Sequence, residues 1–340
     1  GNFRPELDQV FYSVGLPIGP QGGPLELRWG QLLAIATILF LAGVNYFGVR
    51  VGGNVQVVVT ALKVGLILVI IWYGLSSSAG SSANFGTSVA ARAGVVGFFG
   101  ALVAALWAFD GWNNVSMVAS EIQNPQRNLP IALAGGTLLV MAIYLLTNAA
   151  YFYVLPASAV AANDRVAAEM MRVVTGDFGA NAVSLVAMVS IFAALNGSIL
   201  TGSRVPYAMA RDKRFFSVMA YVHPEHRTPA VSILAMSLWA CVLVLSGRYE
   251  DLFTYVIFAS WILYGMTTAA VLVLRKKRPD LHRPYRALGY PVVPILFVVV
   301  SAALVISTLI QSPRESLLGL FLIFLGVPFY WYWKRRSSLE

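Results

Sequence analysis

Two charged side chains stand within long apolar runs of this sequence. Lys63 lies in VVVTALKVGLILVII, and Asp110 lies in LVAALWAFDGWNNVSMVAS. A charge at the centre of a lipid bilayer costs roughly 2.5–3.5 kcal/mol on insertion scales, so such residues are generally kept for a function. A buried ammonium can hold two helices together or change its protonation state, and a carboxylate can meet an amine. Lys63 and Asp110 are therefore the first candidates for a binding or coupling site.

The residues around Asp110 predict an interruption of the helix that carries it. The segment combines aromatic side chains with Asp, Gly and Asn, in the order Trp107, Ala108, Phe109, Asp110, Gly111, Trp112, Asn113 and Asn114. Asp, Gly and Asn are poor helix-interior residues, and Asp and Asn side chains compete for backbone hydrogen bonds. A helix broken at mid-membrane exposes backbone groups and half-helix dipole ends that can bind charged substrates. A second half-helix starting near Asn113 would suit a carboxylate. The alternative is a kinked structural helix in which Asp110 pairs with a neighbour.

The sequence contains no set of residues that would form a metal site and no pair of cysteines that could form a disulfide. The three histidines (His223, His226 and His282) lie in basic loops, and Cys241 is the single cysteine. An intramembrane enzyme would need metal ligands, paired aspartates or a Ser–His pair at membrane depth. The sequence therefore predicts no metal, no cofactor and no enzymatic activity.

Composition predicts a membrane protein built from helices. Hydrophobic residues make up 58% of the 340, and charged residues only 11%, whereas a soluble domain carries about a quarter charged residues. A bilayer core of ~30 Å needs ~20 apolar helical residues, and continuous apolar runs favour helices over the alternating pattern of barrel strands. We expect nine spans, at 30–49, 54–75, 95–120, 131–153, 180–203, 229–246, 252–274, 291–311 and 315–333.

The Lys and Arg residues predict the orientation of these spans. The basic residues concentrate on one side, at Arg50, Arg127, 204–227, 275–286 and 334–336. The side richer in Lys and Arg is normally cytoplasmic. We therefore expect an outside N-terminus and a cytoplasmic C-terminus in the cell (inner) membrane. The net charge of +9 then reflects orientation, so no nucleic-acid partner is expected.

Several segments match a known family in order along the chain. The segment WAFDGWNNVSMVASEIQNPQRNLPIAL (107–133) carries an aromatic–Ala–aromatic run, Gly-Trp, Glu, Asn-Pro and Asn-Leu-Pro. It resembles the sixth helix and following loop of the L-amino acid transporter group in the amino acid–polyamine–organocation superfamily. The segments 195–216, 222–234 and 275–295 are similar to that family's eighth helix, its entry to the ninth, and its loop between the tenth and eleventh.

The resemblance implies a fold. The nine spans would be family helices four to twelve of a leucine-transporter-type, all-α integral membrane fold with two inverted repeats. Residues 1–28 would form an outer loop, 30–75 the remainder of the first repeat, and 95–274 the second repeat. Two C-terminal helices (291–333) would complete a single transmembrane domain (1–333), followed by a cytoplasmic tail (334–340). Family helices one to three are missing, so we expect an N-terminally truncated chain.

The resemblance also implies roles for individual residues. Lys63 matches a fifth-helix lysine that takes the place of a sodium ion in sodium-independent members, although it could be a fixed structural cation. Trp107 matches an aromatic gate over the substrate, although packing is the ordinary role of such a Trp. The substrate-binding residues would be Trp107, Ala108, Phe109, Asp110, Gly111, Asn113, Asn196, Ser198 and Ser260. Glu121 and Arg127 could form gate ion pairs with the basic cluster at 204–214, or be solvated surface charges.

These roles imply a secondary active transporter. We expect sodium-independent exchange or proton-coupled uptake of neutral L-amino acids by alternating access. The alternatives are a polyamine or organic-cation antiporter of the same superfamily, for which only Asp110 is available as an acid at depth, and a non-transport intramembrane protein. Animal members join a heavy chain through a cysteine in the loop corresponding to residues 1–28. Because that segment contains no Cys, no disulfide-linked heavy chain is expected, and the partners are the amino acid substrate and the lipid bilayer.

Overall fold

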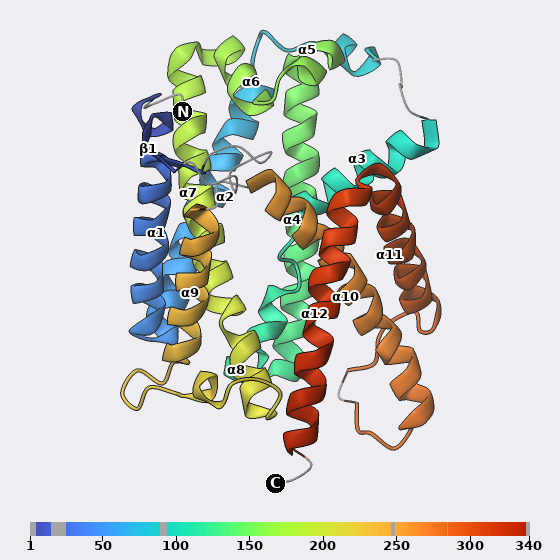
Figure 1. The fold of residues 1–340 in the computed structure, drawn as a ribbon. Coiled ribbons are helices and arrows are strands. Elements are labelled where there is room, and N and C mark those ends of the chain that lie inside the picture. The colour runs from blue at the N-terminus through green and yellow to red at the C-terminus, as the bar shows by residue number, and fades with distance from the viewer. Residues whose placement is uncertain (1–4, 15–24, 89–93, 246–248, 284, 338–340) are drawn as a thin grey trace.

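A computed structural model describes residues 5–14, 25–88, 94–245, 249–283 and 285–337, and these residues are mostly helical (Figure 1). Seven helices are long and apolar enough to cross a membrane. They are α1 (Trp29–Tyr46), α2 (Val49–Leu75), α4 (Pro125–Val154), α7 (Asp177–Gly202), α10 (Tyr249–Lys277), α11 (Val292–Gln311) and α12 (Pro313–Ser337). The predicted all-α membrane class is therefore confirmed.

The two remaining expected spans are shorter or interrupted. The span expected at 229–246 is α9 (Ala230–Leu245), an apolar helix of 16 residues. The span expected at 95–120 is α3 (Gly94–Ala108) followed by the 3-10 helix η4 (Asn114–Glu121). Each of the nine expected spans thus has a helical counterpart. Seven rather than nine helices are long enough to cross a membrane, because α9 is short and the helix at 95–120 breaks after α3.

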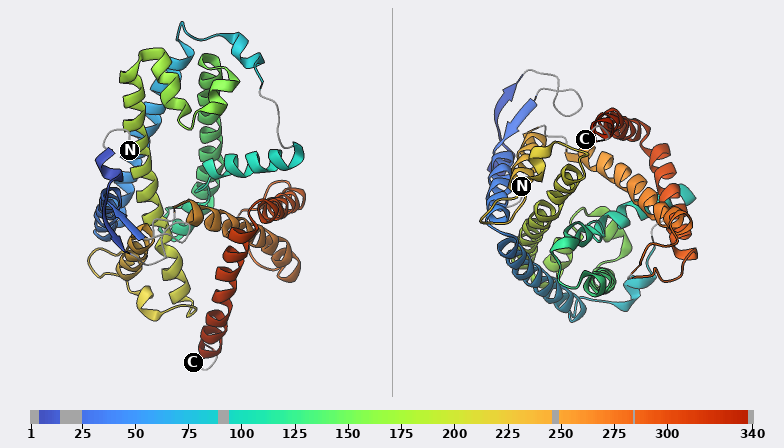
Figure 2. Two further views of the ribbon diagram at one scale, coloured as in Figure 1. Left: turned by 45° about the horizontal axis from the view of Figure 1, so that its top comes forward. Right: turned by 90° about the horizontal axis from the view of Figure 1, so that it is seen from below.

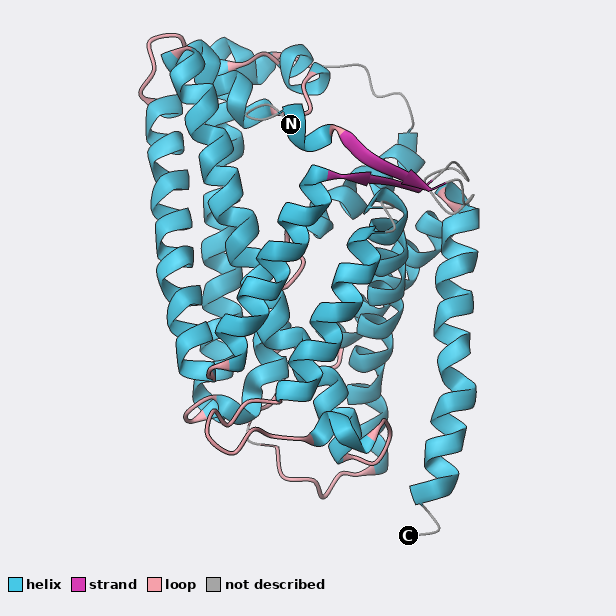
Figure 3. Cartoon of the chain, turned by 60° about the vertical axis from the view of Figure 1, so that its left-hand side comes forward, coloured by secondary structure: helices cyan, strands magenta, loops and turns pink. Residues whose placement is uncertain are grey.

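Short elements connect the long helices. The described part of the expected outer loop forms an antiparallel pair of strands, β1 (Val10–Val14) and β2 (Leu25–Arg28), which lies beside the start of α1 (Figure 3). The other short elements are η1 (Pro5–Asp8), η3 (Ser82–Gly86), α5 (Ala157–Ala162), α6 (Val166–Thr175), α8 (Arg204–Arg211) and η5 (Ser217–Ala220).

Helix boundaries follow local backbone chemistry. Helix α4 begins with Pro125 at its first position, where the missing N–H has no intrahelical partner to lose. The preceding Asn124 takes a left-handed conformation, with φ of 47°, which Asn tolerates better than most residues. Helix α7 starts after Gly176, whose φ of 71° favours glycine. These residues set the points at which the chain reverses direction between spans.

The helices pack in neighbouring pairs. Helix α2 lies along α7, α1 along α9, and α10 along both α11 and α12. Helix α3 runs at a steep angle to α4 (Figures 1 and 2). Helices α5 and α6 lie at one end of the molecule, and α8 and the C-terminal end of α12 lie at the other (Figure 1).

The outer surfaces of the helices are apolar. Trp72 on α2 is 71% exposed, and Leu145 on α4 is 65% exposed. Extended apolar surface of this kind is unusual on a soluble monomer and is normal where side chains meet lipid. At the end that holds α5 and α6, a small buried cluster joins α4 to α6 through Ala150, Val154, Leu155, Met170 and Met171. This cluster fixes α6 against the ends of the long helices.

Candidate functional site

The helix that carries Asp110 breaks where the sequence predicts. Helix α3 ends at Ala108, residues 109–113 form turns, and η4 begins at Asn114. Gly111 has a φ of +91°, a conformation that residues with a side chain rarely adopt. The Asn114 N–H donates to the Gly111 carbonyl at 3.1 Å, and the Ser116 N–H to the Asn113 carbonyl at 2.9 Å. These are bonds between residues i and i−3, so regular α-helical bonding does not continue through the segment.

The second half of this span differs from the expected half-helix. It is a 3-10 helix of eight residues, and Val118 inside it has non-helical angles (φ −105°, ψ 16°). A 3-10 helix is tighter and poorer in hydrogen-bond geometry than an α-helix, and it often marks a hinge or a strained sequence. A cluster of Asn and Ser side chains near its start gives the backbone alternative hydrogen-bond partners. The span is therefore interrupted over more of its length than the sequence suggested.

A tyrosine from α4 closes one side of the break. The Tyr144 hydroxyl donates to the Ala108 carbonyl at 2.7 Å, which supplies a partner for a carbonyl at the end of α3. The Phe109 ring meets the Tyr144 ring edge-on, with centroids 4.9 Å apart. Sequence reasoning missed Tyr144 because it lies in an ordinary apolar run with no local signal.

The other side of the break faces α10. The Tyr264 hydroxyl donates to Asp110 Oδ1 at 3.3 Å. Asn113 and Ser260 also lie near this hydroxyl. The structure therefore brings together three of the expected substrate-binding residues (Asp110, Asn113 and Ser260) around Tyr264, a residue that the sequence did not single out. Ser260 precedes Tyr264 by one helical turn, so the two residues share one face of α10. This spacing is the sequence feature that could have identified Tyr264.

This group offers acceptor atoms to a polar ligand. Asn113 Oδ1 is buried and accepts no hydrogen bond from the described residues, an arrangement that costs free energy unless another donor reaches it. The Asp110 carboxylate lies beside it on an exposed residue. The Trp112 ring centroid lies 6.2 Å from that of Tyr264 and 6.4 Å from that of Phe297 on α11. The site thus combines a carboxylate, an amide oxygen and a phenol with an aromatic wall.

The structure locates Trp107 and Lys63 along their helices but does not test the roles expected of them. Trp107 lies in α3 next to the break, but its side chain lies outside the described residues. Lys63 lies in the middle of α2 and is half-buried. Among the described residues, no carboxylate forms an ion pair with Lys63. The gate role of Trp107 and the coupling role of Lys63 stay predictions.

Asn196 occupies a packed junction between three helices. Its Nδ2 donates to Gln56 Oε1 at 2.8 Å and to the Gly52 carbonyl at 3.3 Å, and its Oδ1 accepts from Asn45 Nδ2 at 2.9 Å. Asn45 and Asn196 are fully buried. This polar junction (Asn45, Gly52, Gln56 and Asn196) joins α1, α2 and α7. Ser198, two residues further along α7, is exposed, so the two expected pathway residues of α7 lie in different surroundings.

Glu121 forms an ion pair with Arg204 in the basic cluster, and its role in a gate stays a prediction. Its two carboxylate oxygens accept from Arg204 Nε at 3.0 Å and from Arg204 Nη2 at 3.2 Å. The Arg204 side chain is 5% exposed and that of Glu121 28%. Arg204 also donates to the Leu200 carbonyl at 2.5 Å and to Ser203 Oγ at 3.1 Å. Arg127 is exposed and forms no ion pair with the described residues, whereas Glu121 links the end of η4 to the start of α8.

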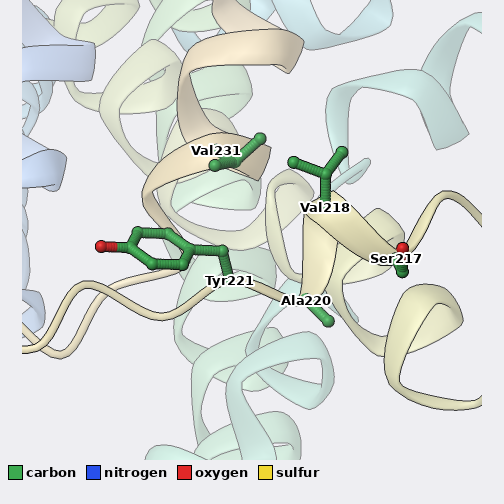
Figure 4. A pocket seen from close by; sticks show the side chains of 5 residues that line it. All are labelled: Ser217, Val218, Ala220, Tyr221 and Val231. Atoms are coloured by element: carbon green, nitrogen blue, oxygen red, sulfur yellow. The ribbon is translucent and has the colours of Figure 1, made fainter.

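The described residues show no metal site at the break. The described residues include no group of three or more His, Cys, Asp or Glu that could hold a metal ion. A shallow, open hollow of about 610 Å³ lies elsewhere, between η5 and the start of α9 (Figure 4). Val218 and Val231 approach each other across this hollow, and Ser217, Ala220 and Tyr221 complete its lining.

Comparison with known proteins decides the family. A family model described as amino acid permease matches residues 18–330, which is most of the chain. The chain belongs to the amino acid permease family. The match includes the broken span, the polar junction and the Glu121–Arg204 pair, so the geometry described above is that of a family member.

Curated relatives carry more specific names. The chain is 34% identical over 322 residues to the b(0,+)-type amino acid transporter 1 of Mus musculus, covering 91% of this chain and 65% of that protein. It is 32% identical over 336 residues to the serine/threonine exchanger SteT of Bacillus subtilis (strain 168), covering 97% of this chain and 76% of that protein. It is 26% identical over 303 residues to the human cystine/glutamate transporter, covering 88% and 60% respectively. The chain thus spans about two thirds of the length of these relatives.

Proposed function

We propose that the protein is a secondary active transporter of neutral L-amino acids that works by alternating access, by exchange or by coupled proton uptake. The observation that carries the proposal is the unwound segment 109–113, where Asp110 and Asn113 meet Tyr264 between two helical halves. Interrupted helices of this kind bind substrates near the bilayer midplane in several transporter folds. The relatives named as a serine/threonine exchanger and as amino acid transporters support the substrate class.

Chemical complementarity supports an amino acid as the substrate. An amino acid carries an ammonium group that needs acceptors, and the break provides the Asp110 carboxylate and the unpaired Asn113 Oδ1. The N-terminal end of η4 carries a partial positive charge that suits the substrate carboxylate. We propose Trp107, Ala108, Phe109, Gly111, Asn196, Ser198 and Ser260 as further pathway residues.

The test is counterflow in proteoliposomes that hold the full-length protein. Vesicles loaded with unlabelled L-serine are expected to accumulate labelled L-serine or L-alanine, and vesicles loaded with putrescine are not. Accumulation driven by putrescine would support the organic-cation alternative instead. If no amino acid of any class drives counterflow in correctly folded protein, the transport proposal fails.

We propose that Lys63 makes the transport independent of sodium. An ammonium fixed inside α2 supplies the positive charge that a bound sodium ion would otherwise supply at this depth. Uptake is expected to be unchanged when sodium is replaced by choline, and to fall about tenfold or more in Lys63→Met. A requirement for sodium in the wild-type protein would contradict this role.

The arrangement in the membrane completes the proposal. We propose the repeats at 30–75 and 95–274, two further helices at 291–333, and a cytoplasmic C-terminus. The basic segments near α8 and the end of α12 lie at the end opposite α5 and α6 (Figure 1), which supports this orientation. Residues 1–28 contain no Cys, which supports transport without a disulfide-linked heavy chain. Labelling by a membrane-impermeant maleimide tests the orientation: a cysteine at Ser78 should react from outside and one at Asp280 only after permeabilisation.

A further inference from the structure

The connection between α10 and α11 concentrates positive charge. Residues 275–290 (RKKRPDLHRPYRALGY) contain six Lys and Arg residues and a single acid, Asp280. The described part of this connection lies at the end of the molecule that holds α8 and the C-terminal end of α12 (Figure 1). Seen from that end, it lies at the rim of the molecule (Figure 2). A partner that binds these charges would therefore be met at the periphery.

One arginine folds the connection back onto the end of α10. Arg283 Nη1 donates to the Pro279 carbonyl at 3.0 Å and to the Leu281 carbonyl at 2.8 Å. Its Nη2 donates to the Leu274 carbonyl at 3.3 Å and to the Arg278 carbonyl at 2.6 Å. Carbonyls at a helix C-terminus lack part of their intrahelical bonding, and basic side chains often supply the missing donors. Arg283 thus fixes the shape of this connection from within.

A second arginine joins the two ends of the connection. The guanidinium carbon of Arg275, at the end of α10, lies 3.9 Å from the Tyr290 ring centroid. A cation this close to an aromatic face is attracted to it. Tyr290 stands two residues before the start of α11 at Val292. Arg275 and Arg283 are therefore both used within the protein.

The other four cations of the connection point to an external partner. Lys276, Lys277, Arg278 and Arg286 are exposed, and Asp280 is exposed as well. None of these four cations forms an ion pair with a carboxylate of the described residues. Because the single acid cannot balance four cations, the surface of the connection carries an excess of positive charge that attracts anions.

Exposed apolar side chains alternate with these cations. Leu281 is 46% exposed, Tyr285 52% and Leu288 81%. Apolar surface left in water is unfavourable. Segments that combine Lys and Arg with exposed aromatic and aliphatic side chains are typical of a membrane surface, where binding adds apolar burial to electrostatic attraction. The position directly after a membrane-spanning helix places the connection within reach of lipid headgroups and favours lipid over a soluble acidic protein.

We propose that the connection at 275–290 is a membrane-surface anchor that binds the headgroups of anionic phospholipids through Lys276, Lys277 and Arg278. Leu288 lies among the lipids at the level of the glycerol backbone, beside the charged layer. A basic cluster immediately beyond a membrane-spanning helix is suited to anionic lipids. The anchor lies outside the break at 109–113, and it does not depend on transport.

The experiment measures where residue 288 lies relative to lipid. The full protein with Cys241→Ser and Leu288→Cys is labelled with bimane and reconstituted in phosphatidylcholine vesicles, with or without phosphatidylglycerol. The vesicles contain a phosphatidylcholine that carries a nitroxide near the glycerol backbone and quenches bimane at that level. Quenching is expected to be about twofold stronger with phosphatidylglycerol. About 0.5 M salt should reduce this difference, because salt screens exposed charges.

Charge variants separate a local anchor from general attraction. Lys276→Gln together with Lys277→Gln should lower the quenching with phosphatidylglycerol to the value in phosphatidylcholine alone. The matched control is Arg50→Gln together with Arg127→Gln, which removes two exposed cations of the same predicted side and should leave the difference unchanged. The melting temperature should stay the same in both double variants, since all four side chains are exposed. Equal losses in the two double variants would mean diffuse attraction and would overturn the anchor.

Two other outcomes would also overturn the proposal. Quenching of the label by aqueous iodide but not by the lipid nitroxide would place residue 288 in water and leave a soluble acidic partner as the occupant. Equal nitroxide quenching with and without phosphatidylglycerol would show an apolar contact that does not involve the anionic headgroup.

Discussion

The break at 109–113 and the polar junction of α1, α2 and α7 use the same residue types with opposite results. Each region contains one buried amide oxygen that accepts no hydrogen bond from the described residues, Asn113 Oδ1 and Asn45 Oδ1. In the junction, Asn45 and Asn196 are fully buried, and the Asn45 oxygen lies against Gly52, where an added Cβ would collide with it. In the break, Asn113 lies beside the exposed Asp110 and the 44% exposed Trp112. A buried Asn therefore joins packed helices where its neighbours fit tightly around it. Where the backbone around it is unwound, the same side chain leaves an acceptor oxygen next to exposed residues.

The largest effect is expected at the link between the two regions. Glu121→Gln removes the carboxylate that pairs with the nearly buried Arg204 and leaves its positive charge without a partner. Because η4 would then be released from α7 and α8, the free energy of unfolding should fall by about 2–3 kcal/mol. Denaturant unfolding in mixed micelles measures this change. Arg127→Gln is the control, and it should change the free energy by less than about 0.5 kcal/mol; similar losses in both variants would remove the link from the comparison.

The next effect tests the tightness of the polar junction. The Cβ of Gly52→Ala would collide with Asn45 Oδ1, whereas Gly53 has nothing within 4 Å of the corresponding position. Gly52→Ala should therefore lower the free energy of unfolding by about 1–3 kcal/mol by forcing α1 and α2 apart. Gly53→Ala should instead stabilise α2 by up to about 1 kcal/mol. Thermal unfolding of the two variants in detergent measures these changes. If the two midpoints shifted in the same direction and by the same amount, the junction would be loosely packed.

The backbone conformation of the break is tested by a transport measurement. In Gly111→Ala the φ of +91° becomes strained by about 1–2 kcal/mol, which should distort the site and lower the rate of counterflow about tenfold. Gly135→Ala on α4 is the control, since that glycine has open space around it and an ordinary backbone conformation. Full transport by Gly111→Ala would mean that the unwound shape of 109–113 is not needed.

The smallest effect concerns the side-chain group around the break. Tyr264→Phe removes a hydrogen bond of 3.3 Å to the exposed Asp110, and a bond of this kind contributes about 0.5–1.5 kcal/mol. The KM for L-serine is expected to rise about threefold while the protein keeps its stability. Uptake kinetics in proteoliposomes and a melting curve on the same preparation measure both quantities. An unfolded variant would assign Tyr264 to packing rather than to the site.

Several features of the fold could be predicted because they depend on local sequence. The nine apolar runs were recognised from their length against the thickness of a bilayer, and the break from the low helix propensity of Asp110, Gly111 and Asn113. The form of the second half of that span could not be predicted, because the choice between an α-helix and the 3-10 helix η4 depends on contacts with α4, α7 and α8. The shortness of α9 and the strand pair β1–β2 were not predicted either.

The membrane class, the family resemblance and the place where the third span unwinds follow from local sequence, since length, composition and propensity act on neighbouring residues. Which side chains meet at the break depends on the packing of the helices. Tyr144 reaches Ala108 across 36 positions, Arg204 reaches Glu121 across 83, and Tyr264 reaches Asp110 across 154. A hydrogen bond requires its atoms within about 3.5 Å with suitable angles. That distance depends on how whole helices pack against one another, and no spacing within the sequence encodes it.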